Sequence, residues 1–207
     1  MPRLAMHRRA MPDSFGWHSR HATSLAIATV SAYSAALLGY SPVSCDGWLG
    51  VRGSASVLMS VGLGLWLAVM TITVSRNLVH RTKWAKALCV ALQPPLSGIG
   101  GSTLVAAAVG GALGEELLFR GLLVPVLGIL GSSILFGAVH RIGGEGRWGW
   151  MAWATIMGLL FGSIFEATGS IAGAVVAHAA VNLYNFRFLR DFRRPVQARP
   201  LGGLLHR

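Results

Sequence analysis

Charged residues are scarce in this chain of 207 residues: only 12% are Asp, Glu, Lys or Arg, and only seven residues are acidic. An ordinary soluble domain has about twice that charged fraction. Hydrophobic residues make up 53% of the chain, and they fall in long runs rather than at the spacing of amphipathic elements. This composition excludes an ordinary soluble domain and predicts a membrane protein.

Cysteine is nearly absent as well. The chain has only Cys45 and Cys89, which are far apart and have neither metal-binding nor redox spacing. We therefore expect two unpaired cysteines rather than a disulfide framework or a cysteine-ligated metal site. The C-terminal sequence GLLHR also lacks a prenylation box.

The few acidic residues leave a formal net charge of +11. In a soluble protein this excess would suggest binding to nucleic acid. Here the basic residues flank the apolar runs, in residues 1–21, in the loop 75–87 and after residue 187. The positive-inside rule places all three regions in the cytoplasm. We expect anionic lipids as the partners of both tails and of loop 75–87, and no nucleic acid.

The apolar runs predict an all-α, polytopic transmembrane helical bundle of the cell membrane with about six spans. Basic cytoplasmic tails, residues 1–21 and 188–207, flank a transmembrane domain at residues 22–187. The expected spans are roughly 23–40, 54–74, 87–121, 122–140, 149–166 and 171–187. Both termini are then cytoplasmic, because an even number of crossings separates the basic loop from the C-terminal tail.

The third expected span is irregular. Gln93-Pro94-Pro95 and several glycines interrupt it, so we expect a broken or re-entrant helix there. Irregular backbone is tolerated at membrane depth only where protein or water surrounds it. Gly158 and Gly162, further along the chain, indicate close packing of helices.

Two adjacent glutamates, Glu115 and Glu116, lie with Arg120 in otherwise apolar sequence. On a helix, Glu116 and Arg120 are i,i+4 neighbours and form a favourable ion pair, which is by itself a structural clamp. Glu115 lies about 100° further round the helix and has no partner in its own segment. A buried carboxylate without a cation partner is suited to act as a general base or acid.

Two histidines also stand out. Of seven in the chain, only His140 and His178 lie in or beside apolar runs. At i,i+4 spacing, His178 and Asn182 project from one helix face and are able to address a single oxygen atom. Taken singly, each of these side chains suits an interhelical hydrogen bond, and Phe136, four residues before His140, suits packing. Together with Glu115, on three separate helices, they indicate a polar catalytic cavity between the helices.

These motifs resemble the CPBP family, the CaaX-protease and bacteriocin-processing intramembrane endopeptidases. That family is marked by EExxxR, FxxxH and HxxxN or HxxxD in that order. The three motifs are complete here as Glu115-Glu116-x-x-x-Arg120, Phe136-x-x-x-His140 and His178-x-x-x-Asn182. The resemblance covers a core of about residues 100–186, whereas the first two predicted helices and both tails carry no family signal.

The resemblance implies an intramembrane endopeptidase that hydrolyses a peptide bond of a membrane-associated protein or peptide precursor. Glu115 would be the general base that activates water, assisted by His140. His178 and Asn182 would donate hydrogen bonds to the oxyanion of the tetrahedral intermediate. Glu116, Arg120 and Phe136 would be supporting residues.

A metal-dependent mechanism is the alternative. Glu115, His140 and His178 form a legitimate set of ligands for Zn²⁺. The HExxH spacing is absent, however, and the sequence shows no second shell of residues to orient the ligands. We therefore favour glutamate catalysis without a metal or other cofactor.

Two other classes of function compete with proteolysis. Intramembrane Glu and His residues also form proton relays in transporters, although no inverted repeat is evident in this sequence. A non-catalytic membrane adaptor or immunity protein is the other alternative. Such a protein would be free to lose Glu115 or His178, and here both motifs are complete.

Overall fold

The computed structural model describes residues 53–96 and 98–192, and over these residues the fold is entirely helical. The predicted all-α class is therefore confirmed. The elements are α3 (Gly53–Arg81), α4 (Lys83–Leu92), η1 (Pro94–Leu96), α5 (Gly101–Glu116), η2 (Leu117–Leu123), α6 (Val124–Val139), α7 (Arg147–Thr168) and α8 (Ala172–Asp191). The predicted span 23–40 and the N-terminal tail lie outside the described residues, as does the C-terminal tail beyond residue 192.

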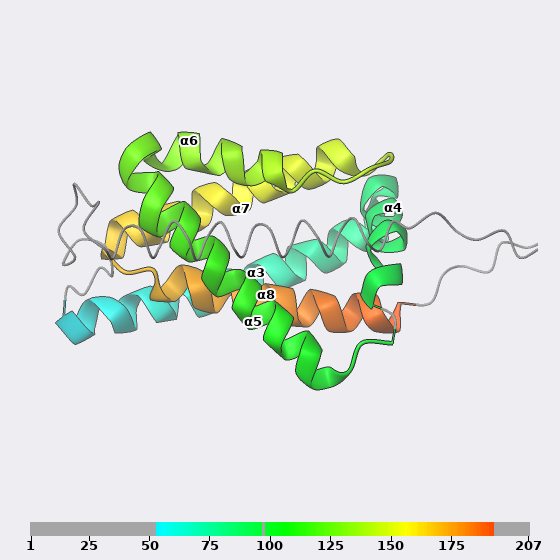
Figure 1. Ribbon diagram of the computed structural model, residues 1–207, viewed down its shortest axis with the longest axis horizontal. Helices are drawn as coiled ribbons and strands as arrows, with labels where there is room; N and C mark the ends of the chain where they lie inside the picture. Colours follow the sequence, from blue (N-terminus) through cyan, green and yellow to red (C-terminus); the bar gives the residue numbers. More distant parts are fainter. Residues whose placement is uncertain (1–52, 97, 193–207) are drawn as a thin grey trace, which may run out of the picture.

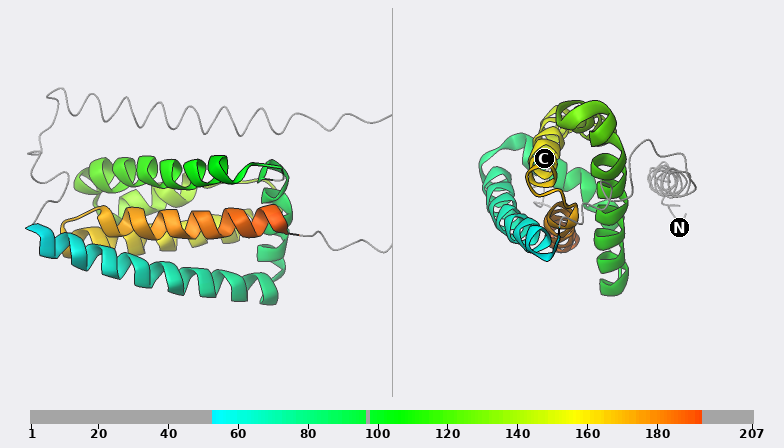
Figure 2. Two further views of the ribbon diagram at one scale, coloured as in Figure 1. Left: turned by 90° about the horizontal axis from the view of Figure 1, so that it is seen from below. Right: turned by 90° about the vertical axis from the view of Figure 1, so that its left-hand side faces the viewer.

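The long helices run lengthwise through the bundle. Figure 1 shows α3, α6, α7 and α8 along the long axis, with α5 crossing them at an angle and the short α4 standing across one end. Helix α8 packs against both α3 and α5, and α6 packs against α7. The C-terminal ends of α3 and α8 lie at the end that α4 covers (Figure 2).

Glycines and serines allow α3 and α8 to approach closely. A side chain at Gly64 would collide with the backbone of Gly173, and one at Gly173 would collide with Ser60. The Ser60 hydroxyl donates to the Ser170 carbonyl at 3.0 Å and accepts from the Gly173 amide at 2.9 Å. On α7, Gly158 and Gly162 pack against α6, which confirms the close packing predicted for that pair.

A tight turn joins α7 to α8. Gly169 ends α7 with φ at +64°, a left-handed conformation that glycine adopts without a steric penalty. The Thr168 hydroxyl accepts from the amide of Ser170 at 3.2 Å, and the Ser170 hydroxyl accepts from the amide of Ala172 at 3.3 Å. These bonds fix the direction in which α8, and with it His178, leaves the turn.

The predicted break in the third apolar run is confirmed. Helix α4 ends at Leu92, and the chain passes through η1 before α5 begins at Gly101. Beyond the break, α5 is uninterrupted and carries both glutamates at its C-terminal end. Its buried residues recur every fourth position, which turns one stripe of α5 toward the bundle: Leu104, Ala108, Ala112 and Glu116.

The segment after the glutamates is a π-helix, η2, in which the Val124 amide bonds to the Phe119 carbonyl. Gly128, at φ +69° and ψ 172°, then breaks the helical path inside α6. Only glycine adopts this backbone region readily, and the break separates the directions of α5 and α6 (Figure 1). Ser132 and Ser133 lie buried inside α6, where Ser132 donates to the Phe119 carbonyl at 3.0 Å.

Three helical stretches are long and apolar enough to cross a membrane: Gly53–Arg81, Gly101–Val139 and Arg147–Thr168. The second comprises α5, η2 and α6. Helix α8 is not among them, because it carries His178, Asn182 and several charged residues. The chain is therefore a helical membrane protein, but the predicted number of six spans is not confirmed.

Candidate active site

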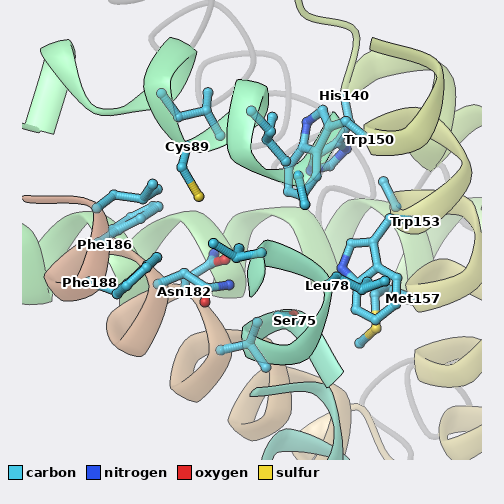
Figure 3. A pocket seen from close by; sticks show the side chains of 18 of the residues that line it. Ser75, Leu78, Cys89, His140, Trp150, Trp153, Met157, Asn182, Phe186 and Phe188 are labelled. Atoms are coloured by element: carbon cyan, nitrogen blue, oxygen red, sulfur yellow. The ribbon is translucent and has the colours of Figure 1, made fainter. Parts of the chain in front are cut away.

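A cavity of about 320 Å³ opens between α3, α4, α7 and α8, with Glu115 at its inner wall. All four predicted catalytic residues line it: Glu115 from α5, His140 at the end of α6, and His178 and Asn182 from α8. Figure 3 shows Asn182 on α8 facing the space that His140, Trp150 and Trp153 border from the other side. Tertiary structure therefore brings residues 67 positions apart in sequence, Glu115 and Asn182, into one cavity.

Glu115 lies between the two histidines. Its Oε2 atom is 3.7 Å from Nε2 of His140 and 3.8 Å from Nε2 of His178. Both distances exceed a hydrogen bond, and the buried Oε2 atom has no hydrogen-bond partner among the described residues. The Glu115 side chain as a whole is 23% exposed and lines the cavity, while its Oε2 atom is buried between the two imidazoles.

The FxxxH motif orients His140. Its Nδ1 atom lies 2.7 Å from the Phe136 carbonyl oxygen, one helical turn earlier. A carbonyl only accepts, so Nδ1 carries the proton and donates to it. Nε2, the other ring nitrogen, is then directed toward Glu115. The Phe136 ring lies against the imidazole with 4.3 Å between ring centroids, so Phe136 holds His140 by packing as well as by its backbone.

His178 is oriented by Glu116. Its Nδ1 atom lies 2.8 Å from Glu116 Oε1, and Arg120 Nη1 donates to the same oxygen at 3.1 Å. The predicted Glu116–Arg120 ion pair therefore forms, but it is more than a clamp within one helix. It extends to α8 and fixes the ring of His178, in the way that an outer carboxylate fixes a functional histidine.

Arg120 is buried, with 1% of its side chain exposed. Besides Glu116, its guanidinium donates from Nη2 to the Gly158 carbonyl at 3.0 Å. Its Cζ atom lies 4.8 Å from the ring centroid of Phe136 and 5.2 Å from that of Phe161. A buried arginine needs such partners, because an unpaired charge away from water costs several kcal/mol.

Sequence reasoning missed Phe161. Its ring stacks on the imidazole of His178, with centroids 5.2 Å apart and an interplanar angle of 23°. The sequence did contain an indication that Phe161 faces the bundle. Phe161 shares a helix face with Gly158 and Gly162, the pair that marks the closely packed side of α7. That face carries both the carbonyl that binds Arg120 and the ring that supports His178.

Asn182 lies one turn after His178, as its spacing predicts, and is half-buried in the cavity wall. No hydrogen-bond partner of its amide is found within the described ranges, so the amide is available to a bound molecule. Asn182 and His178 thus face the same space from one helix.

The expectation that the Glu115–His140–His178 set lacks a second shell is wrong. The Phe136 carbonyl orients one imidazole and the Glu116 carboxylate orients the other. Within residues 53–96 and 98–192, no group of three or more His, Cys, Asp or Glu side chains is arranged to hold a metal ion.

Comparison with known proteins gives one result. Residues 101–184 match the family described as type II CAAX prenyl endopeptidase Rce1-like. No curated protein and no solved structure matches the chain. The matched segment contains all three motifs and every residue of the two histidine arrangements above. The predicted resemblance to CaaX-type intramembrane proteases is thereby confirmed over residues 101–184.

Proposed function

We propose that the chain is an intramembrane endopeptidase in which Glu115 activates water to hydrolyse a peptide bond of a membrane-associated protein or peptide. The observation that carries this proposal is the position of Glu115, which lines the cavity and whose Oε2 atom lies 3.7 Å and 3.8 Å from Nε2 of two oriented histidines. A water molecule held by Glu115 and His140 would be the nucleophile.

In the first step, Glu115 takes a proton from this water while the hydroxide oxygen bonds to the carbonyl carbon of the substrate. The carbonyl oxygen becomes an oxyanion, which Nε2–H of His178 and the amide of Asn182 stabilise. Donors placed for such a charge are typically worth about 10²–10³ in rate each. In the second step, Glu115 returns the proton to the amide nitrogen as the carbon–nitrogen bond breaks, which releases a carboxylic acid and an amine.

The role of His178 demands a particular protonation state. Because its Nδ1–H bond points to Glu116, a neutral ring would have a bare Nε2 atom facing the cavity. Donation to an oxyanion therefore requires the imidazolium. The Glu116 carboxylate accepts from Nδ1 of His178, and Arg120 fixes the carboxylate in turn.

The cavity would face the cytoplasm. The ends of α3 and α8 lie together (Figure 2), and the described basic side chains outside the core gather at that end: Arg76, Arg81, Lys83, Lys86, Arg141, Arg147, Arg187 and Arg190. This distribution supports the positive-inside orientation, with anionic headgroups as partners of the basic surface.

The test is a comparison of membrane-protein termini in cells that carry the wild-type chain or Glu115→Ala. New termini present with the wild type and lost with the variant would reveal catalysis and name the substrate together. The variant must be present in the membrane at the wild-type level. Unchanged termini in a stably inserted Glu115→Ala protein would exclude proteolysis by Glu115 and favour an adaptor.

A further inference from the structure

Arg76 lies near the end of α3 and lines the same cavity as Glu115 and His178. It is the only lysine or arginine among the residues that line this cavity. The surrounding wall is mostly apolar and includes Leu88, Leu92, Phe186 and Leu189. A cation in such surroundings interacts with an anion more strongly than it would in open water.

The guanidinium is held in place without being neutralised. Arg76 Nη1 donates to the Tyr184 hydroxyl at 3.2 Å, and its Cζ atom lies 4.5 Å from the ring centroid of Phe188. No carboxylate lies within ion-pair distance of it among the described residues. Arginine has five N–H donors in a planar fork that matches a carboxylate, so most of its donors are left for a ligand.

The charge of Arg76 reaches the opposite wall. Cys89, on α4, lines the cavity across from α3 (Figure 3). Burial raises the pKa of the Cys89 thiol, and the positive charge of Arg76 opposes that rise. Arg76 and Cys89 therefore line the same cavity within electrostatic reach of each other.

We infer that Arg76 binds a carboxylate of the peptide substrate and so determines which peptides are presented to Glu115. This inference rests on the proposed protease function. A peptide supplies the carboxylate either at its free C-terminus or on an acidic side chain, and the apolar wall accommodates its neighbouring residues. Arg76 and Glu115 line the same cavity, so a peptide bound there is able to contact Arg76 with its carboxylate and Glu115 with its scissile bond.

The test measures binding rather than hydrolysis, using the full chain with Glu115→Gln in detergent. The first probe pair is acetyl-Ala-Leu-Val-Leu as the free acid and as the C-terminal amide. The second pair is acetyl-Ala-Leu-Asp-Leu amide and acetyl-Ala-Leu-Asn-Leu amide. Fluorescence of Trp84, Trp150 and Trp153, which line the cavity, reports binding.

In at least one of the two peptide pairs, the affinity of the anionic peptide should exceed that of its neutral partner by about tenfold or more. Arg76→Gln should abolish that difference, and Arg76→Lys should keep part of it. Arg81→Gln is the matched control, because Arg81 lies on the same end of α3 but does not line the cavity. The Arg81→Gln variant should prefer the anionic peptide as strongly as the Glu115→Gln parent protein does.

The inference is overturned if neither pair shows a preference, if no peptide binds, or if the preference survives Arg76→Gln. A preference found only in the first pair assigns Arg76 to the C-terminus, and one found only in the second assigns it to an acidic side chain. Since the parent protein here carries Glu115→Gln, the result does not depend on turnover. Hydrolysis with no carboxylate preference would refute this inference and leave the proposed function intact.

Discussion

Glu115 and Glu116 are neighbours in the chain, yet they belong to two clusters that differ in burial and pairing. In the buried cluster, Glu116 is 0% exposed and its Oε1 atom accepts from both Arg120 and His178. In the cavity cluster, Glu115 is 23% exposed and no hydrogen bond reaches its buried Oε2 atom from the described residues. One carboxylate therefore maintains structure and orientation, while the other is left available for chemistry.

The difference follows from helix geometry. Successive residues of an α-helix point about 100° apart, so adjacent side chains cannot share one environment. Glu116 continues the buried stripe of α5, and Glu115 projects from the side of α5 toward the cavity. Five experiments sharpen or break this contrast.

The largest effect is expected from Glu115→Gln. The amide keeps the size of the side chain but cannot take a proton from water, so kcat should fall by about 10³-fold or more. Stability should change little, because no partner is lost. The measurement is hydrolysis of an identified substrate by purified protein, with thermal unfolding in parallel. A variant that keeps a tenth of wild-type kcat would assign the base elsewhere.

Arg120→Met should instead destabilise the protein, by about 3–5 kcal/mol, because Glu116 would be left as a buried charge without its cation. Unfolding in detergent with increasing denaturant measures the loss. The double variant Glu116→Leu/Arg120→Met should recover most of the stability, because it removes both charges. It should remain poorly active, since His178 would lose its acceptor. Full activity in the double variant would show that the buried cluster has no part in orienting His178.

Asn182→Ala should lower kcat by about 10²-fold, the typical cost of removing one oxyanion donor. KM and stability should stay near the wild-type values, because the amide has no partner within the described ranges. Asn185→Ala is the matched control: Asn185 also lines the cavity but lies three residues after Asn182, outside the motif. Equal losses in both variants would contradict an oxyanion role specific to Asn182.

A smaller effect is expected from Phe161→Leu. The ring supports the buried cluster by stacking on His178 and lying over Arg120, and such aromatic contacts are worth about 0.5–1.5 kcal/mol. Stability should fall by about 1–2 kcal/mol and kcat by a few-fold. Thermal unfolding and hydrolysis, measured with Phe165→Leu as a comparison, separate this contact from general packing, because Phe165 is buried on the same helix but does not line the cavity. If kcat is unchanged in Phe161→Leu, Phe161 has no part in holding His178 in position.

The smallest effect should come from metal removal. If Glu115 acts as a carboxylate base without a metal, prolonged treatment with 1,10-phenanthroline should leave kcat unchanged. Inactivation by the chelator, reversed by Zn²⁺ and accompanied by measured metal release, would instead support the alternative in which Glu115, His140 and His178 bind zinc. Metal analysis of the purified protein provides the second measurement.

Much of the site was predictable because its motifs are local. The i,i+4 spacing of Glu116 with Arg120 and of His178 with Asn182 describes helix faces that each form within one segment. The break near Pro94 and the turn at Gly169 were also readable, since proline and glycine act on the backbone at their own positions. Phe161 was not readable, because an aromatic residue in an apolar helix has the same local pattern whether it faces lipid or a histidine.

The sequence by itself determined that this is an all-helical membrane protein and which polar residues are too costly to lie in lipid without a purpose. It did not determine every helix: residues 75–87, expected as a loop, are helical except for Thr82, because α3 continues to Arg81 and α4 begins at Lys83. Tertiary structure alone decided their pairing. It joined Glu116 to His178 across 62 positions of sequence and directed Arg76 into the cavity of Glu115. The physical reason is that local spacing sets the direction of a side chain about its own helix, whereas packing of the helices decides what that side chain meets.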